Sequence, residues 1–563
     1  MIKEKKNIQS LLFALIALLV LNWLGSKFYH RFDLTQDKRY TLSEAAKATL
    51  EQANSPINIE VFLDGNLPPE FKRLKNETQQ LLEEFRAANP NVIYQFVDPQ
   101  SSEETLRSVQ TQLQQLNLRG ALVQIQEGGK TTNETIYPWA IAYHNEKVVP
   151  IGLLKKIQGK TPEERVNASI QNLEYAFADG FGKLTQPKRR KVAVLKGNAE
   201  MDDRYIADFI TTLRDYYYIG QFTLDSVAVS PQRTLESIQG YDLLIVAQPQ
   251  QSFSEEEKYV LDQYVMHGGS SLWMIDATTQ RLDTVSGNSF AFGIDLGLND
   301  FFFKYGVRIN PNLVKAIPPS YVVLATGEER DSDYTPFPWL FSPLVASETS
   351  HPIVNNIDPV KFEYVSSLDT LPNAIDKTLL LSTGIESKII GLPAEIDLDR
   401  EIPKNVEIML QKENSRPGFN AGPVPVAVLL EGEFQSVYAN RVKPFPLQNA
   451  RDSSPVSKMV VISDGDVIKN QLDRGRPLEL GYDKWTNKFH GNKEFLLNTV
   501  NYLLDDSGLI NIRSKEIAVA FLDLDKTSEK RGLWQFVNLV VPLVLLLLFG
   551  IVFRYLRKRK FAR

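Results

Sequence analysis

The chain has 563 residues, of which 43% are hydrophobic and 23% are charged, and it contains no cysteine. At about 150 residues per domain, this length predicts about three or four folding units, and the ordinary charged fraction excludes a wholly disordered chain. The absence of cysteine excludes disulfides, thiolate metal ligands and cysteine nucleophiles. The net charge of −5 divides into +2 in residues 1–24, +6 in 554–563 and −13 between them. An acidic body argues against a nucleic-acid partner, which needs a basic surface.

Uncharged apolar segments lie near both ends of the chain, at 8–24 and 533–553. Crossing a bilayer takes about 17–25 such residues, so we expect transmembrane helices at 8–25 and 532–553; for the first, a cleaved signal peptide is the alternative. The tails outside them, 1–7 and 554–563, are basic, which predicts that both termini are cytoplasmic. The protein is then expected in a bacterial inner membrane, with its large body in the periplasm.

The first part of this body reads as a small α/β domain over 56–185, after a juxtamembrane segment at 26–55. Apolar runs predict strands at 57–63, 92–97 and 121–125, and residues spaced by three and four predict intervening helices. Two more strand-like runs, near 136–143 and 147–153, precede a helix at 162–178. This order of elements, a strand, a helix and a strand followed by strands that look antiparallel, is compatible with a thioredoxin-like sheet.

The second part alternates strands and helices more regularly. Buried-type strands are predicted by the apolar runs at 191–195, 241–247, 271–275 and 459–463. Such alternation predicts a mostly parallel, doubly wound sheet, loosely similar to class I amidotransferase-like domains, over 186–300 and 455–507. Residues 301–454 are expected as a β-rich insertion, and 508–531 as a second juxtamembrane segment.

Sequence motifs for catalysis are missing. There is no G-x-x-x-x-G-K-[ST] loop, so the chain is not itself a transport ATPase, and there is no G-x-S-x-G elbow. The five histidines are far apart and form no zinc motif, and the amidotransferase nucleophile, a cysteine, is absent. We therefore expect no enzyme, no metal and no cofactor; a degenerate hydrolase is a remote alternative.

One group of polar residues could still form a site. Ligands of parallel α/β sheets bind beyond the carboxyl ends of the strands, and five residues lie just past predicted strand ends: Glu200, Gln248, Asp276, Asp464 and Asp466. Together they could hold a divalent cation or a cationic group. The alternative is that they cap the helices that follow, where acidic residues favour the positive end of the helix dipole.

Several long stretches are familiar: KRRKVAVLKGNAE (188–200), the run from Tyr241 to Asp276, LGLNDFFFKYGVRINPNLV (296–314), MVVISDGDVIKN (459–470) and GNKEFLLNTVNYLLDD (491–506), with RFDLTQDKRYTLSEAAKATL (31–50) before them. These stretches resemble the gliding-motility-associated ABC transporter auxiliary proteins of the GldG family, often labelled substrate-binding. The resemblance implies an inner-membrane protein of Bacteroidetes that works with a separate permease and a separate ATPase, without identifying a transported substrate. It carries no catalytic motif. The alternative is an envelope scaffold with no transport role.

Overall fold

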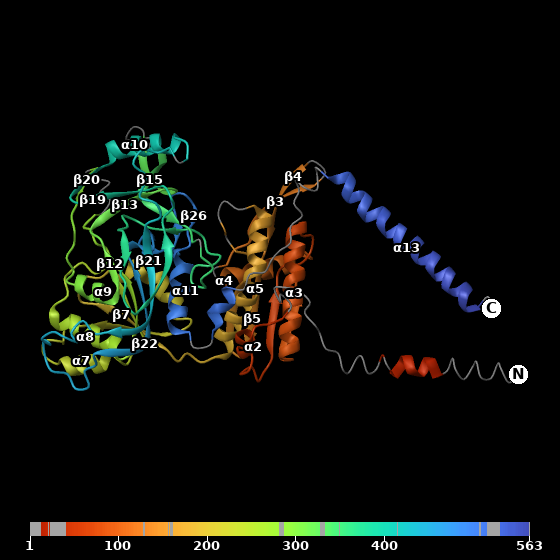
Figure 1. The fold of residues 1–563 in the computed structure, drawn as a ribbon, viewed down its shortest axis with the longest axis horizontal. Helices are drawn as coiled ribbons and strands as arrows, with labels where there is room; N and C mark the ends of the chain where they lie inside the picture. The colour runs from red at the N-terminus through yellow and green to blue at the C-terminus, as the bar shows by residue number, and fades with distance from the viewer. Residues whose placement is uncertain are drawn as a thin grey trace. The chain divides into compact units, whose positions relative to one another are not determined.

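The computed structural model describes residues 13–20, 22, 41–116, 118–127, 130–155, 157, 161–280, 287–326, 333–347, 349–413, 415–505, 508–514 and 530–561. It shows a mixed α/β protein (Figure 1). The chain divides into two units, a body up to Glu516 and a C-terminal unit from Ile517 that holds one helix. The body contains two lobes, each built on its own sheet.

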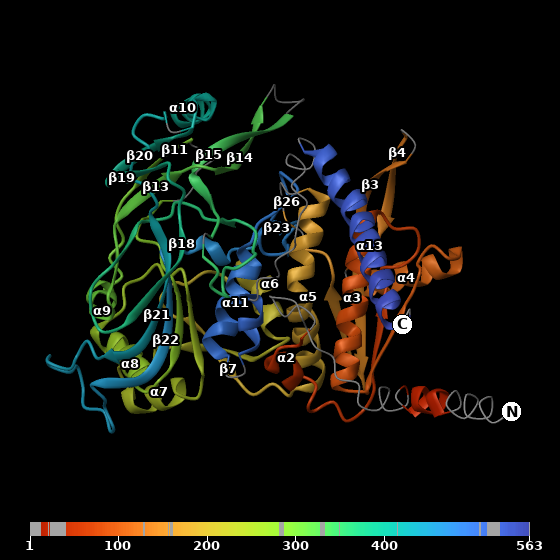
Figure 2. The same cartoon turned by 45° about the vertical axis from the view of Figure 1, so that its right-hand side comes forward.

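The first lobe is built on a four-stranded sheet with the order β2-β1-β5-β6. Strands β1 and β2 are parallel and the other two pairs are antiparallel. Helices α3 and α5 lie side by side against it (Figure 2), where the rings of Phe85 and Phe181 meet edge to face with centroids 4.9 Å apart. The elements of this sheet are β1 (Ile57–Val61), β2 (Val92–Phe96), β5 (Trp139–His144), β6 (Lys147–Gly152), α3 (Pro69–Ala88) and α5 (Pro162–Thr185).

Part of the expected order differs in this lobe. The strand expected at 121–125 is present as β3 (Ala121–Glu127), but it pairs only with β4 (Lys130–Ile136), as a hairpin apart from the four-stranded sheet. The short helices α2 (Glu44–Ala48) and α4 (Glu103–Gln115) complete the lobe. The likeness to thioredoxin stays a prediction.

The second lobe is built on a seven-stranded sheet with the order β18-β21-β22-β10-β9-β7-β8. The five strands from β22 to β8 are parallel, while β21 and β18 are antiparallel to their neighbours. Their bounds are β7 (Lys191–Lys196), β8 (Tyr218–Thr223), β9 (Leu243–Ala247), β10 (Ser270–Met274), β18 (Asp376–Ser382), β21 (Pro425–Gln435) and β22 (Ser453–Ile462).

Both faces of this sheet are buried. Successive residues of a strand point to opposite faces, and on each face they join an apolar cluster. Val192 and Val194 pack with one apolar cluster and Ala193 and Leu195 with the other. Helices α6 (Asp203–Leu213) and α11 (Asn492–Leu504) supply the first cluster, and α7 (Pro231–Ile238), α8 (Glu255–Met266) and α9 (Asn299–Tyr305) supply the second. Continuous apolar strands are therefore explained by burial on both sides.

Part of the range 301–454, expected as a β-rich insertion, belongs to the main sheet. It contributes β18 and β21 to the seven-stranded sheet, where β21 pairs with β22 along most of its length. Antiparallel pairing between distant segments leaves no local pattern in the sequence, so these two strands could not be assigned to this sheet in advance. Strand β8 and helix α7, which had no counterpart among the expected elements, lie between α6 and β9.

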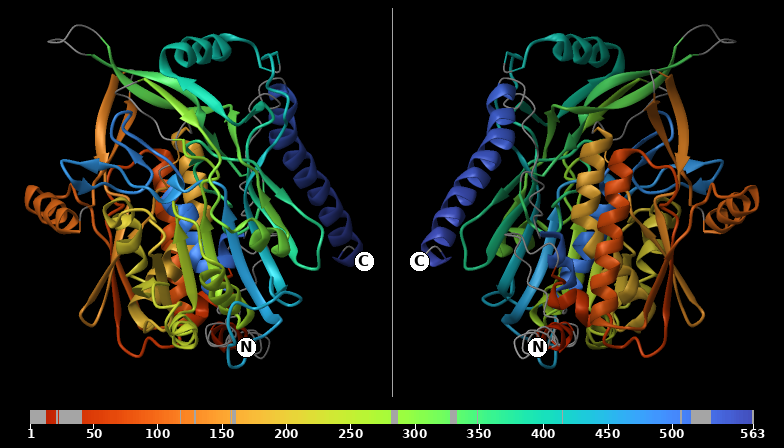
Figure 3. Two further views of the ribbon diagram at one scale, coloured as in Figure 1. Left: turned by 90° about the vertical axis from the view of Figure 1, so that its left-hand side faces the viewer. Right: turned by 90° about the vertical axis from the view of Figure 1, so that its right-hand side faces the viewer.

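The rest of the second lobe consists of small sheets and short helices. Strands β14 and β15 form a long ribbon that extends from the lobe (Figure 3). The small sheets comprise β11 (Asn288–Ala291) with β20 (Ala394–Asp397), β12 (Val307–Ile309) with β17 (Leu368–Thr370), β13 (Asn312–Ala316) with β19 (Ser387–Gly391), β14 (Pro319–Thr326) with β15 (Asp333–Val345) and β16 (Val360–Lys361), β23 (Leu472–Asp473) with β24 (Arg476–Pro477), and β25 (Tyr482–Asp483) with β26 (Lys488–Phe489). The helical pieces are α10 (Leu398–Leu410) and η1 (Asp466–Ile468). Segment η2 (Leu509–Ser514) follows α11 and packs into the core of the first lobe.

The C-terminal unit contains the apolar helix expected near 532–553. Helix α13 (Arg531–Phe561) has the length and composition of a membrane span over Arg531–Arg559, with a mean hydropathy of 2.8 in an 18-residue window. Within the described part of the chain it is the one helix that meets these criteria. Of the span expected at 8–25, the structure describes only 13–20, which is helical, and residue 22; the rest lies outside the described residues.

Candidate functional site

Three parallel strands end close together in the second lobe, and their ends are joined by hydrogen bonds. Gln248 follows β9 directly, and its amide Nε2 donates to Asp276 Oδ2 at 2.7 Å. The other oxygen of Asp276, which lies just past β10, accepts from the backbone N–H of Gly465 after β22 at 2.6 Å. Only glycine fits at 465, because a Cβ there would lie 2.4 Å from Gln248 Cγ. Gln248, Asp276 and the segment after β22 therefore lie together at the carboxyl ends of these strands.

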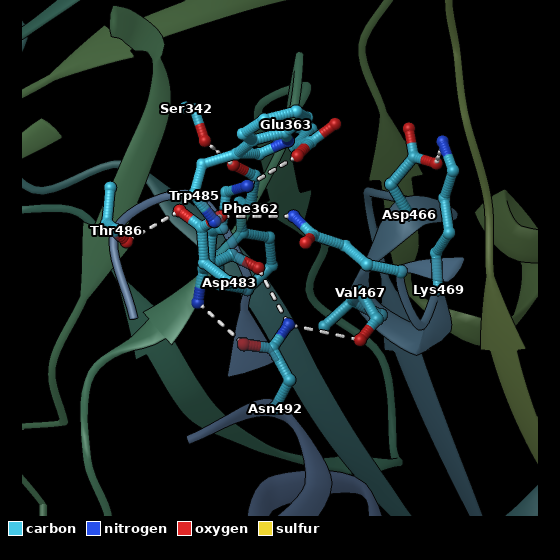
Figure 4. A network of polar contacts seen from close by, with 12 residues as sticks. Ser342, Phe362, Glu363, Asp466, Val467, Lys469, Asp483, Trp485, Thr486 and Asn492 are labelled. Carbon is cyan, nitrogen blue, oxygen red and sulfur yellow. Dashed lines mark hydrogen bonds and ion pairs between the residues drawn. The ribbon is translucent and has the colours of Figure 1, made fainter. Parts of the chain in front are cut away.

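Asp464 extends this network toward a distant loop. Its side chain is fully buried, and Oδ2 accepts from the backbone N–H of Glu363 at 2.6 Å while Oδ1 accepts from that of Asp466 at 2.7 Å. Asp466, the first residue of η1, pairs with Lys469 at 2.6 Å (Figure 4). One buried carboxylate thus ties the segment after β16 to the end of β22.

Glu200 lies apart from these contacts. Its Oε2 accepts from the backbone N–H of Asn198 at 2.9 Å, within the loop after β7. Its Oε1 and the Asn198 Oδ1 are buried and have no hydrogen-bond partner among the described residues. The structure therefore brings together Gln248, Asp276, Asp464 and Asp466, and leaves the fifth residue in its own loop.

The helices of this edge begin at other residues. The carboxylate of Asp202 accepts from the Arg204 N–H at the start of α6, and Ser254 forms a capping box with Glu257 at the start of α8. Neither Glu200 nor Gln248 serves as these caps, whereas Asp464 bonds to the first residue of η1. As for metals, no cluster of three or more carboxylate or histidine side chains able to hold an ion is found among the described residues.

The pKa values of these carboxyl groups are shifted in opposite directions, because only some of the groups have cations near them. Burial raises the pKa of Asp276 to about 7, and the charge of Asp466 adds to this effect. Burial, together with Asp466 and Asp276, holds the pKa of Asp464 well above its ordinary value. Burial also acts to raise the pKa of Glu363, but Lys361 and Lys469 outweigh it and lower that pKa.

Beside the end of β22 lies a cavity of about 300 Å³. Two ion pairs belong to its lining, Lys361 Nζ to Glu363 Oε1 at 2.7 Å and Lys469 Nζ to Asp466 Oδ1 at 2.6 Å. We call this cavity the β22 pocket. Its polar lining residues include Lys361, Glu363, Asp466, Lys469, Asp483 and His490, and its aromatic ones are Tyr205, Tyr482 and Trp485.

Two further side chains hold the loops around the β22 pocket in place. Asn492, at the start of α11, accepts from the Lys361 N–H at 2.9 Å and donates to the carbonyl oxygens of Lys361 and Val467. Asp483 accepts from the backbone N–H of Trp485 at 3.1 Å and from the Thr486 hydroxyl at 2.8 Å (Figure 4). These two groups are occupied by the protein itself, so their role is to position the lining.

His490 differs from them, because its ring nitrogen Nε2 is buried and has no partner within the described residues. Burial and the nearby charge of Lys361 lower the pKa of His490 to about 4. The imidazole is therefore neutral near pH 7, and its polar Nε2 belongs to a residue that lines the β22 pocket. A buried polar atom without a partner is costly, so such an atom beside a cavity marks a place where a ligand group can bind.

Reasoning from the sequence missed this side of the site. Lys361, Glu363, Asp483 and His490 come from loops and two-residue strands, in which no periodic pattern precedes them. Among the lining residues, Asp466 was the one that the strand-end rule could find.

The geometry defines a mixed α/β protein with a polar pocket at the sheet edge and a candidate membrane helix at its C-terminus. A family model described as an ABC-type uncharacterized transport system matches residues 189–499, more than half of the chain. The chain belongs to this family of transporter auxiliary proteins, and membership suggests an accessory role. A second model, described as a Domain of unknown function (DUF7088), matches residues 36–143.

Two individual proteins were also found to be similar. An "Uncharacterized protein" of Borreliella burgdorferi is 22% identical over 545 residues, which is 94% of each chain. The solved "mmIFT52 N-terminal domain" is 14% identical with a TM-score of 0.31, over 56% of this chain and 98% of that chain.

Proposed function

We propose that the protein is a non-enzymatic accessory subunit of an ABC transporter that works with a separate permease and a separate ATPase. The observation that carries this proposal is the family match over 189–499. The sequence supports it further, because it has no phosphate-binding loop of its own and would depend on a partner for ATP hydrolysis. The finer assignment, to the GldG family of gliding Bacteroidetes, rests on the stretches that resemble that family.

The same proposal places the protein in the inner membrane, with a helix at each end and both termini in the cytoplasm. Helix α13 and the basic residues that follow Phe553 support the C-terminal part of this topology. The acidic body then lies in the periplasm, where it could contact the outer side of a permease.

Co-purification tests this role directly. The affinity-tagged full chain is isolated from membranes of its native host in a mild detergent, and the recovered proteins are quantified by mass spectrometry. We expect one permease and one ATPase subunit in constant ratio to the chain, and neither with a tagged, unrelated protein of the same membrane. Recovery with other envelope proteins but never with a permease would contradict the accessory role and favour a scaffold.

The absence of enzyme activity is a separate part of the proposal. Asp276 and Asp464 are engaged by backbone and amide N–H groups, which leaves them poorly placed for proton transfer. We expect no hydrolysis of esters or amides by the purified chain. Turnover that disappears in Asp466→Asn would overturn this expectation.

A further inference from the structure

We propose that the β22 pocket binds a neutral, hydroxyl-rich ligand of one or two rings, which is the chemistry of a small sugar. The proposal concerns this pocket alone and does not depend on the accessory role. It rests on the balance of charges in the lining, the unpartnered nitrogen of His490 and an exposed aromatic ring.

The charges of the lining are balanced. Three lysines (Lys361, Lys469 and Lys484) and three carboxylates (Glu363, Asp466 and Asp483) line it. The two ion pairs satisfy four of these groups; Lys484 donates to the Leu472 carbonyl oxygen at 2.8 Å, and Asp483 accepts from Trp485 and Thr486. A charged ligand would have to displace one member of a pair and leave the other without its counter-charge in a partly buried site, which is costly. The pocket therefore favours a ligand without net charge.

Hydroxyl groups suit ion pairs of this kind, since each hydroxyl both donates and accepts hydrogen bonds. Lys361 and Glu363 present an ammonium and a carboxylate side by side at 2.7 Å, and Lys469 and Asp466 do so at 2.6 Å. Two neighbouring hydroxyls can accept from the ammonium and donate to the carboxylate without separating the pair. Such bonds to charged groups are stronger than those between neutral groups. A ligand with several adjacent hydroxyls thus gains at both pairs.

His490 adds a neutral partner. Its Nε2 is buried without a partner among the described residues, and it is an acceptor or a donor according to which ring nitrogen carries the proton. A hydroxyl can satisfy it in either state. A carboxylate or an ammonium could do so in only one of them.

An aromatic surface completes the site. Trp485 is 51% exposed although it lines the pocket, and its ring lies 5.2 Å from that of Tyr334. The apolar C–H face of a ring sugar can pack on such a side chain while its hydroxyls reach the polar wall. A volume of about 300 Å³ lies at the lower end of ligand pockets, which limits the ligand to one or two rings.

The test uses the full chain in a detergent without a sugar headgroup, since a maltoside would compete. Binding of glucose, N-acetylglucosamine and maltose is measured by saturation-transfer NMR and calorimetry, with glucose 6-phosphate and alanine as charged and zwitterionic comparisons. We expect at least one neutral sugar to bind, and to bind more tightly than both comparison compounds. No binding of the three sugars at millimolar concentration, or tighter binding of either comparison compound, would overturn the proposal.

Two variants connect the binding to the β22 pocket. Lys469→Met removes a charged hydrogen-bond donor and should weaken the sugar about tenfold or more; Trp485→Ala should also weaken it. Phe290→Ala is the matched control, because Phe290 is a similarly exposed aromatic side chain (56%) that is absent from the pocket lining. The melting temperature of each pocket variant without sugar should equal that of the wild type, which shows that the variant is folded. Unchanged affinity in both would place the sugar elsewhere and contradict the assignment.

Discussion

At the scale of single residues, Asp276 and Asp464, which follow the carboxyl ends of β10 and β22, have raised pKa values. Burial and the charge of Asp466 raise the pKa values of both Asp276 and Asp464. Asp466 alone has a cation in contact, Lys469. The network at the ends of β9, β10 and β22 should therefore make stability depend on pH.

For Asp276 the sign follows from the direction of the shift. Its pKa is about 7 in the folded chain and 3.8 as the ordinary value, so the folded state keeps a proton that the unfolded state loses between these pH values. The free energy of unfolding should fall as pH rises through this window, by at most about 1.4 kcal/mol per pH unit. We expect Asp276→Asn to remove this slope in denaturation measured from pH 4 to 7.

Asp473→Asn serves as the control, because Asp473 is exposed in the two-residue strand β23. The lowered pKa of His490 produces a slope of the opposite sign between about pH 4 and 6.5. That slope is common to all three chains and cancels in the comparison. An equal slope in the wild type and in Asp276→Asn would show that Asp276 ionises normally.

The sequence could predict only those residues of the site that directly follow apolar strands. Gln248, Asp276 and Asp464 follow apolar strands directly, and parallel strands bring their carboxyl ends to one edge. Lys361 and His490 are placed by Asn492, by Gly481 and by tertiary contacts of loops that are far apart in the chain. Such contacts leave no periodic signal, so the side of the β22 pocket that contains Lys361 and His490 could not be predicted.

At the scale of elements, strands buried on both faces were the easiest to predict. Strands β7 and β9, most of β10 and the second half of β22 are largely apolar and buried, as expected between two helix layers. Strand β8 lies at the sheet edge, is largely exposed or half-buried, and contains a glycine, so it lacks this signature. Strand β21 begins with an apolar run as well. Its pairing with β22, however, depends on tertiary contacts that the sequence pattern does not show.

Helix α8 provides a test of capping. The Ser254 hydroxyl accepts from the Glu257 N–H at 3.2 Å, and the Glu257 carboxylate accepts from the Ser254 N–H at 2.8 Å. Ser254→Ala should lower the free energy of unfolding by about 1 kcal/mol, because one helix N–H loses its acceptor. Urea denaturation measures the effect, provided that the dependence of the unfolding free energy on urea concentration is the same in both chains.

Ser230 is the matched control for this substitution. It occupies the same position before α7, but its side chain makes no capping hydrogen bond. Ser230→Ala should therefore change stability by much less than Ser254→Ala. Equal losses in the two variants would mean that the box at α8 contributes no more than an ordinary serine.

At the scale of the whole molecule, a cluster of three charges joins the two lobes of the body. Lys155, after β6 of the first lobe, and Arg513 of η2 both contact Glu494 in the first turn of α11, at 2.9 and 2.6 Å. Their side chains are 11% and 4% exposed. Burial opposes the charge of Glu494, but the two cations outweigh it and lower its pKa.

Removing the shared acid should be severe. Glu494→Gln removes the carboxylate that two buried cations share, which we expect to cost about 3–5 kcal/mol of stability. Glu103→Gln is the control, since Glu103 and its partner Arg107 are both exposed and such pairs contribute about 0–1 kcal/mol. Thermal and urea denaturation of the three chains distinguish these values. Similar stability of both variants would show that the lobes do not rely on this cluster.

The proposed anchoring at both ends predicts a pattern of truncations. A chain without residues 530–563 should stay in the membrane fraction after a carbonate wash, held by the segment at 8–24. A chain without 1–24 should stay as well, held by α13. Only the double truncation should be released. Release by loss of α13 alone would contradict a membrane span at the N-terminus.

Segment η2 gives the body a mechanical connection. It is the last described part of the body before α13, and Ile510 and Ile512 are buried in the core of the first lobe while Arg513 holds Glu494 of the second. Because the chain is continuous, tension applied to the C-terminal helix reaches the body at this point. A force on the helix would then act on both lobes, so we expect it to break the contacts between the lobes before it unfolds either sheet.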